Sequence, residues 1–151
     1  LIKEVELRKN PVILRVNKFD EDSAKKFSIE VAQAHNTGQK IIPVVIDSYG
    51  GEVYSLMSMI SDIKHAELPV ATIVEGKAMS CGAVLFTFGE EGMRFMDRNC
   101  GKKDDYFLKI VDKKKHADWF LDADECKKHN LVNQLRIPKF NISIDVNIDF
   151  E

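Results

Sequence analysis

The sequence predicts an α/β fold in which a largely parallel sheet is packed with helices. Two observations lead to this prediction. The first is that short continuous apolar runs of strand length alternate with segments that show helical spacing. The second is that this alternation occurs three times along the chain. The chain has 151 residues, of which 44% are hydrophobic, so it can bury one sizeable core but not two. We therefore expect a single domain over residues 1–151.

The first strand–helix–strand unit occupies the N-terminal third. Residues 11–16 read as a buried strand, and the acidic residues at 20–22 supply caps for a helix that ends near Gly38. The apolar residues of that helix recur at helical spacing: Ala24, Phe27, Val31 and Ala34. Residues 41–46 form the next apolar run of strand length.

Two further units follow. After a turn at 47–51, apolar residues from Val53 to Ile63 mark one face of a helix, and Pro69 leads into a strand over 70–74. A turn at 76–82 then opens an apolar helix, which we expect to continue over 83–88. A short strand at 93–96 closes the third unit. Strands that alternate with helices favour a parallel sheet.

The C-terminal part differs in pattern. We expect a helix over 106–111 and a second helix that starts at a capping box formed by Asp122 and Glu125 and ends near Asn130. Residues 140–150 alternate apolar and polar side chains, which predicts a half-buried strand at a sheet edge or a subunit contact.

Composition excludes several classes of function. The 22 basic and 24 acidic residues give a net charge of −2, so we expect no nucleic-acid partner. No apolar run approaches the ~18 residues that cross a bilayer, and no signal-peptide layout opens the chain, so we expect no membrane association. Cys81, Cys100 and Cys126 lack disulfide or zinc spacing, which favours the reducing cytoplasm and no metal site. No nucleotide motif occurs, and no cofactor is expected.

Ser80 is a candidate nucleophile. It follows a predicted strand, precedes an apolar helix and lies between Ala78 and Gly82, which is a small-x-Ser-x-Gly elbow. Such a turn exposes the serine hydroxyl and directs the N–H of Cys81 and the helix N-terminus at an oxyanion. An ordinary helix cap is the competing interpretation, since serine and glycine are common at helix starts.

Gly50 and Gly51 are candidate backbone donors at the end of the preceding strand. Open α/β sheets place ligands at this edge, and adjacent glycines let the backbone approach a ligand closely. An ordinary strand-to-helix turn would also explain a lone Gly-Gly pair. Two such turns at one edge make a shared site more plausible, because their N–H groups could converge.

Three ordered motifs resemble the Clp peptidase (ClpP) family. Residues 48–53 (Ser-Tyr-Gly-Gly-Glu-Val) are similar to its Ser-Pro-Gly-Gly-x-Val element, with Tyr49 in place of proline. Residues 76–83 (Gly-Lys-Ala-Met-Ser-Cys-Gly-Ala) resemble its Gly-x-Ala-Ala-Ser-Met-Gly-Ala nucleophile motif. Residues 118–126 are similar to its Asp-Arg-Phe segment, and residues 130–133 (Asn-Leu-Val-Asn) to its Gly-Leu-Ile/Val-Asp.

The resemblance implies a ClpP/crotonase-like fold of repeated β-β-α units and a serine endopeptidase that hydrolyses unfolded polypeptides. It implies that Ser80 is the nucleophile and Asp118 the triad acid, and that Gly51 and Cys81 supply the oxyanion-hole N–H groups. The implied substrate-binding loop contains Gly50, Glu52 and Val53. Stacked heptameric rings and a Clp-type AAA+ unfoldase that supplies ATP hydrolysis are the implied partners.

The histidine that acts as the catalytic base in this family has no counterpart at the matching position of this sequence. The family follows Arg-Phe with a strand ending in Met-Ile-His and a handle helix, whereas here residues 94–96 run directly into residues 97–101. We expect a missing handle segment between Met96 and Asp97. His35, His65 and His129 lie at helix ends, where cationic capping is the simpler explanation. His116 is two residues from Asp118, and at that spacing in an extended segment the two side chains point to opposite faces.

Other functions stay open at this point. A non-catalytic ring subunit predicts no base anywhere in the chain. Related folds include viral capsid-maturation peptidases, signal-peptide peptidases with a Ser-Lys dyad, and acyl-CoA hydratases. Lys77 is the lysine nearest to Ser80 in sequence, and three residues before a nucleophile it more simply marks solvent exposure. The hydratases give no reason to expect the Ser80 and Asp118 motifs together.

Overall fold

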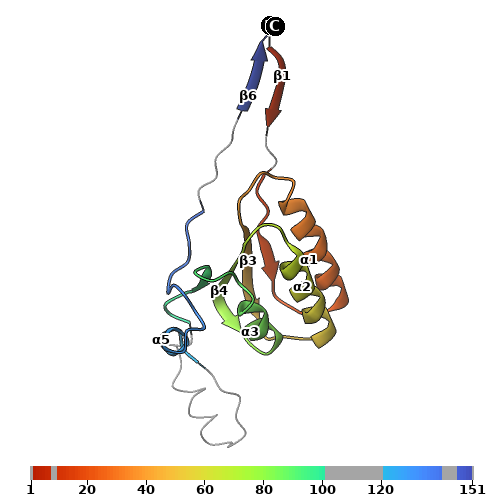
Figure 1. Cartoon of the computed structure of the whole chain (residues 1–151). Helices are drawn as coiled ribbons and strands as arrows, with labels where there is room; N and C mark the ends of the chain where they lie inside the picture. The colour runs from red at the N-terminus through yellow and green to blue at the C-terminus, as the bar shows by residue number, and fades with distance from the viewer. Residues whose placement is uncertain (1, 8–9, 101–120, 141–145, 151) are drawn as a thin grey trace, which may run out of the picture.

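A computed structural model of the chain describes residues 2–7, 10–100, 121–140 and 146–150 (Figure 1). Its main sheet has four parallel strands in the order β2-β3-β4-β5. They are β2 (Leu14–Val16), β3 (Ile42–Ser48), β4 (Val70–Ala78) and β5 (Arg94–Met96). The expected α/β fold with a parallel sheet is confirmed.

Helices make the crossovers between successive parallel strands. They are α1 (Glu21–Ala34), α2 (Val53–His65) and α3 (Cys81–Phe86), while α5 (Ala123–Lys128) follows β5 in the chain. Figure 1 shows α1 and α2 side by side, with α5 at the opposite side of the sheet. No helix in the part of the chain that the structure describes is long and apolar enough to span a bilayer.

The main core lies between the sheet and the helices. Side chains that alternate along β3, such as Val44 and Ile46, pack with Met59 of α2 and Leu85 of α3, all of which are fully buried. A second, smaller cluster contains Val45, Ala71, Ile73 and Phe95. Because successive strand residues point to opposite faces, both faces of the sheet are apolar, as a parallel sheet requires.

Two strand ends differ from their expected positions. Strand β2 begins at Leu14 rather than at residue 11, because Pro11 has no N–H and the Val12 N–H donates to Gln39 Oε1 at 2.8 Å instead of to a strand. Strand β4 continues to Ala78, past the expected end at residue 74. The capping box of α5 is confirmed: the Glu125 N–H donates to Asp122 Oδ1 at 2.8 Å.

The chain ends form a separate two-stranded antiparallel sheet. β1 (Ile2–Leu7) pairs with β6 (Val146–Phe150), away from the main sheet (Figure 1). The strand expected in the C-terminal tail is confirmed over 146–150, whereas a strand at 2–7 was not expected. The helix expected over 106–111, together with His116 and Asp118, lies outside the described residues.

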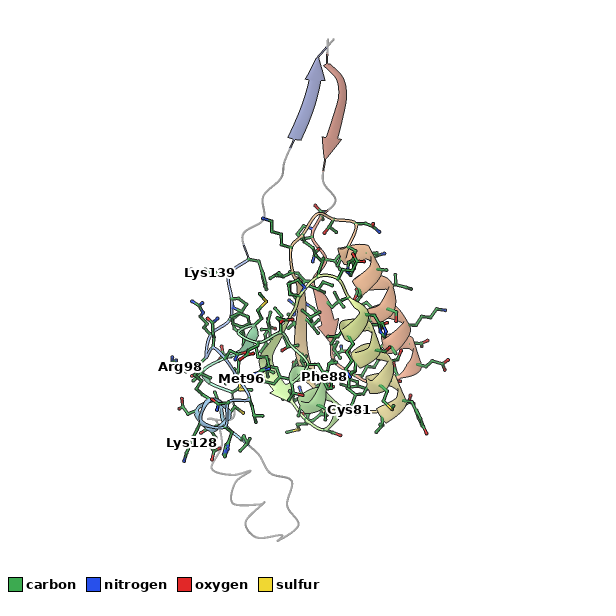
Figure 2. All side chains as sticks on the ribbon, in the orientation of Figure 1. Cys81, Phe88, Met96, Arg98, Lys128 and Lys139 are labelled. Carbon is green, nitrogen blue, oxygen red and sulfur yellow. The ribbon has the colours of Figure 1, made fainter. Side chains whose placement is uncertain are left out.

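Arg94 attaches the segment after α5 to the last strand of the main sheet. Its Nε donates to Leu131 O at 3.1 Å, and its backbone N–H donates to Asn133 Oδ1 at 3.0 Å. The Asn133 N–H returns a hydrogen bond to Arg94 O at 2.8 Å. The C-terminal part therefore packs beside β5, where Figure 2 shows Met96, Arg98 and Lys128 on the side of the sheet away from α1 and α2.

Candidate active site

The two turns singled out in the sequence lie in contact at one edge of the sheet. β3 and β4 are parallel neighbours, and the chain leaves both at their carboxyl ends. The Met79 N–H, in the turn after β4, donates to Ser48 O at 3.0 Å. In the turn after β3, the Gly50 N–H donates to Ser48 Oγ at 3.0 Å. Ser48, which is fully buried, therefore joins the two turns.

Ser80 has a backbone conformation that serine rarely adopts. Its φ is 50° and its ψ is −120°, and it precedes the first residue of α3. A non-glycine residue held this way costs about 1–3 kcal/mol and needs the surrounding structure to enforce it. The other non-glycine residue with positive φ in the described part of the chain is Asn130, at the end of α5, where asparagine is tolerated. Ser80 is thus at a strained strand-to-helix elbow.

The side chain of Ser80 does not cap the helix. No side-chain capping hydrogen bond occurs at α3, although serine is among the best capping residues. Backbone groups satisfy the turn instead: the Gly82 N–H donates to Met79 O at 2.8 Å, and the Val84 N–H to Ser80 O at 3.2 Å. Since Ser80 is exposed, its hydroxyl is accessible for chemistry. The capping interpretation of this serine is wrong.

Gly50 lies directly against Ser80. A Cβ placed on Gly50 would be 2.7 Å from Ser80 Cβ and 3.2 Å from Ser80 Oγ. The φ of Gly50 is 109°, a value that residues with a Cβ rarely adopt. Both the backbone angle and the close approach therefore require glycine, and the turn after β3 reaches the serine hydroxyl.

Gly51 packs on a third segment, which the sequence did not indicate. A Cβ on Gly51 would overlap Phe19 O, and the Glu52 N–H donates to that same oxygen at 2.8 Å. Phe19 is buried and precedes α1, so the connection from β2 to α1 supports the Gly-Gly turn. Phe19 is some thirty residues away in sequence, and no local pattern marks it.

Cys81 links the Ser80 elbow to Gly51. Its thiol is buried and donates to Gly51 O at 3.3 Å. Within the described residues, neither the Gly51 N–H nor the Cys81 N–H donates to a backbone or side-chain acceptor. The structure thus brings Gly50, Gly51, Ser80 and Cys81 together and leaves two backbone donors unused beside the serine. Such donors can stabilise an oxyanion.

Glu52 and Val53 continue from this turn into α2. Both are exposed, with 60% of Val53 accessible to solvent, and Glu52 Oε2 accepts a hydrogen bond from Ser55 Oγ at 3.2 Å. Glu52 and Val53 therefore follow directly after the Gly-Gly pair, whose Gly50 lies against Ser80, and both face solvent. Asp118, the expected triad acid, lies outside the described residues.

The lysine near Ser80 is poorly suited to act as a base. Lys77 Nζ pairs with Asp47 Oδ1 at 2.8 Å, and this hydrogen bond raises the pKa of Lys77 above its ordinary value. A lysine general base needs a lowered pKa, so that its amine is neutral at the working pH. The Ser-Lys dyad therefore finds no support at this site.

The side-chain hydrogen bonds of His35 and His65 involve residues other than Ser80. His35 and His65 end α1 and α2, and because each helix crosses back from the carboxyl ends of the strands, its last turn lies at the opposite edge. His35 Nδ1 lies 2.8 Å from Val31 O, and the Glu67 N–H donates to His35 Nε2 at 3.1 Å. His35 therefore contacts a carbonyl of the last turn of α1, where a helix cap was expected.

The chain runs directly from β5 into a turn at the point where the sequence departs from the family pattern. The Asp97 N–H donates to Val74 O at 3.0 Å, and the Asn99 N–H donates to Asp97 Oδ1 at 2.7 Å. Asp97 therefore both extends the contact with β4 and starts the turn that leads to Cys100. A handle between Met96 and Asp97 stays a prediction.

Comparison with known proteins gives a consistent family assignment. The family model described as Clp protease matches residues 4–103, which is more than half of the chain. A similar curated protein is the ATP-dependent Clp protease proteolytic subunit of Deinococcus radiodurans, 40% identical over 53 residues. That match covers 35% of this chain and 26% of the relative, about a quarter of its length. With the strained Ser80 elbow and the Gly-Gly turn in contact at one sheet edge, the chain belongs to the Clp protease family.

Proposed function

We propose that the chain is the proteolytic subunit of an ATP-dependent Clp-type protease, a serine endopeptidase with Ser80 as its nucleophile. One observation carries the proposal: Ser80 is exposed and strained, does not cap α3, and lies against Gly50. Strain of this kind persists where function requires an exact side-chain position. Family membership supports the same chemistry.

The proposed reaction is acyl transfer from a peptide to Ser80 Oγ. The hydroxyl attacks the peptide carbonyl, a general base accepts its proton, and the amine leaves with a proton from that base. The N–H groups of Gly51 and Cys81 stabilise the negative charge on the carbonyl oxygen. Water then hydrolyses the ester. In this proposal Asp118 orients the base, and Gly50, Glu52 and Val53 bind the substrate backbone.

The general base is the part of this proposal that the chain as printed does not supply. We infer that the full protein, a single domain over these residues, carries a histidine in a handle segment between Met96 and Asp97. Intact mass tests this directly, because the printed residues account for 17.2 kDa. A mass several kDa larger, with extra peptides between those residues, would supply the base.

A cytoplasmic ring assembly completes the proposal. The name of the Deinococcus relative describes a proteolytic subunit of an ATP-dependent protease. By that likeness, stacked heptameric rings enclose Ser80, and a Clp-type AAA+ unfoldase feeds polypeptides to it. ATP hydrolysis belongs to that partner in this scheme, since no nucleotide motif occurs in this chain.

Covalent labelling tests the nucleophile. The full-length protein is incubated with a fluorophosphonate, and the modified residue is mapped by mass spectrometry. We expect label on Ser80, loss of label in Ser80→Ala, and unchanged labelling in Ser58→Ala. Ser58 is a matched control because it is an exposed serine on α2. Peptide hydrolysis should fall roughly 10⁴-fold or more in Ser80→Ala.

A non-catalytic ring subunit is the second candidate. The direct passage from β5 into the turn at Asp97 favours it, because residues 97–101, which follow the strand, contain no histidine. It predicts a mass equal to that of the printed residues and no label on Ser80. Label on Ser80 together with the larger mass would exclude it.

A further inference from the structure

An irregularity in the main sheet lies just before both turns of the site. Ile46 of β3 pairs with Val74 of β4, and the next paired residues are Ser48 and Ala78. One residue of β3, Asp47, therefore stands opposite three residues of β4, at positions 75–77. A bulge of this kind re-aims the strand that carries the extra residues, here β4 as it enters the Ser80 elbow.

The Asp47 carboxylate occupies the space at this bulge. A Cβ on Gly76 would be 2.8 Å from Asp47 Oδ1, so the absence of a side chain there lets the carboxylate approach β4. The same oxygen accepts the Lys77 backbone N–H at 3.2 Å and Lys77 Nζ at 2.8 Å. Asp47 thus holds both the backbone and the side chain of Lys77.

Lys77 also contacts the turn that follows β3. Its Nζ lies 4.5 Å from the centre of the Tyr49 ring, which is within the range of a cation–π interaction. Tyr49 is 74% exposed, so little else packs on its ring, and it directly precedes Gly50, which touches Ser80. One lysine therefore connects the end of β4, the bulge and the residue before the Gly-Gly pair.

We propose that Lys77 is a positioning residue that holds Tyr49, and through it Gly50 and Gly51, against the Ser80 elbow. The inference rests on the proposed function, since the turn it positions is the one proposed to bind substrate and the oxyanion. A proline at position 49 would fix its own φ and stiffen the turn without a partner. Tyrosine leaves φ free, and the ion pair with Asp47 and the ring contact replace that restraint.

The interaction can be observed directly by NMR. Protons above an aromatic ring shift upfield, so the Lys77 ε-methylene resonance should lie upfield of the exposed lysines in full-length protein labelled with ¹³C-lysine. Tyr49→Leu should move it back, and the Gly50 and Gly51 amide resonances should shift in Lys77→Met. Lys64→Met is the matched control: Lys64 Nζ lies 5.5 Å from the Phe88 ring at the other end of α2. We expect it to leave those amides unchanged.

The consequence for the site is measured as the rate at which a fluorophosphonate labels Ser80. We expect Lys77→Met to slow labelling roughly tenfold, because small displacements of catalytic groups are costly. Lys77→Arg should keep most of the rate, since arginine also pairs with carboxylates and stacks on rings. Tyr49→Pro should restore the rate in the Lys77→Met background, and Lys64→Met should match wild type. If Lys77 only stabilised the fold, Tyr49→Pro would not restore the labelling rate of Lys77→Met.

The outcomes separate this inference from the proposed function. If wild type does not label at Ser80, the peptidase proposal fails, and the Gly50 and Gly51 amide shifts still decide the positioning role. Unchanged amides in Lys77→Met overturn the positioning role whatever the activity. A labelling rate that Lys77→Met leaves at the wild-type value, or a double variant that Tyr49→Pro does not rescue, also overturns it.

Discussion

Two helices begin at the same edge of the sheet with good capping residues, and only one of them is capped. Asp20 precedes α1 with φ −142°, accepts the Ser23 N–H at 2.8 Å and completes a capping box with Ser23. Ser80 precedes α3 with φ 50° and makes no side-chain capping bond. At the start of α1 the Asp20 and Ser23 side chains bond to backbone groups of their own turn. At the start of α3 the Ser80 hydroxyl makes no such bond.

The difference shows that residue type does not decide whether a serine caps a helix or performs chemistry. The contact with Gly50 and the backbone bond between Met79 and Ser48 impose the Ser80 conformation. The start of α1 also reaches the site, because Phe19, just before Asp20, packs against Gly51 in the turn after β3. The capped turn therefore supports the Gly-Gly turn that lies against Ser80.

The largest change in unfolding free energy should come from disrupting the contact between Phe19 and the Gly-Gly turn. Gly51→Ala places a Cβ onto the Phe19 backbone at φ 153°, so we expect a loss of about 2–3 kcal/mol in unfolding free energy. Gly92→Ala is the control, since Gly92 also has positive φ (84°) but no atom within 4 Å of an added Cβ, and should lose only about 1 kcal/mol. Urea unfolding of both variants measures the difference. Equal losses would show that the Phe19 contact is unimportant.

Relieving the backbone strain at Ser80 should change the unfolding free energy by less, and in the opposite direction. Glycine adopts positive φ without a steric cost, so Ser80→Gly should gain about 1 kcal/mol in stability although it removes the proposed nucleophile. Ser80→Ala keeps the Cβ and should be close to neutral. Thermal unfolding of the two variants side by side checks this. A destabilised Ser80→Gly would mean that the elbow is not strained.

Removing the cap at the other helix should lower stability. Asp20→Ala loses the hydrogen bond that the Ser23 N–H donates to Asp20 Oδ1, and we expect a lower unfolding midpoint. Asp22→Ala, in the first turn of the same helix, changes the same charge without touching the cap and should have a smaller effect. Circular dichroism melts compare the two variants. Equal midpoints would indicate that charge, rather than capping, matters at α1.

The smallest effect should be a pH dependence of the same cap. The hydrogen bond from Lys18, at 2.7 Å, and those from Ser23 lower the pKa of Asp20 to about 2 from its ordinary 3.8. A lowered folded-state pKa means that this stabilisation is complete above the unfolded value and is lost as pH falls from about 4 to about 2. The midpoint advantage of wild type over Asp20→Asn should therefore shrink across that range. A constant difference would contradict the ionic contribution.

The strand–helix alternation, the capping box of α5 and the small-x-Ser-x-Gly elbow could all be predicted from the sequence. These depend on interactions within about four residues or on the period of apolar side chains, which are visible in one segment. Even there, Gln39 shortened β2 by bonding to Val12 from 27 residues away. The pairing of β1 with β6 joins the two chain ends and had no local signal.

The contacts that hold the site together form only in the folded chain. The support of Gly51 by Phe19, the bond from the Met79 N–H to Ser48 O, and the link of Lys77 to Asp47 and Tyr49 all join different strands or the turns that follow them. Such contacts depend on strand order, register and the bulge opposite Asp47, which no segment specifies alone. Sequence pattern located the serine and the glycines. Only the packed sheet set the strained φ of Ser80 and left its hydroxyl unpaired with the helix.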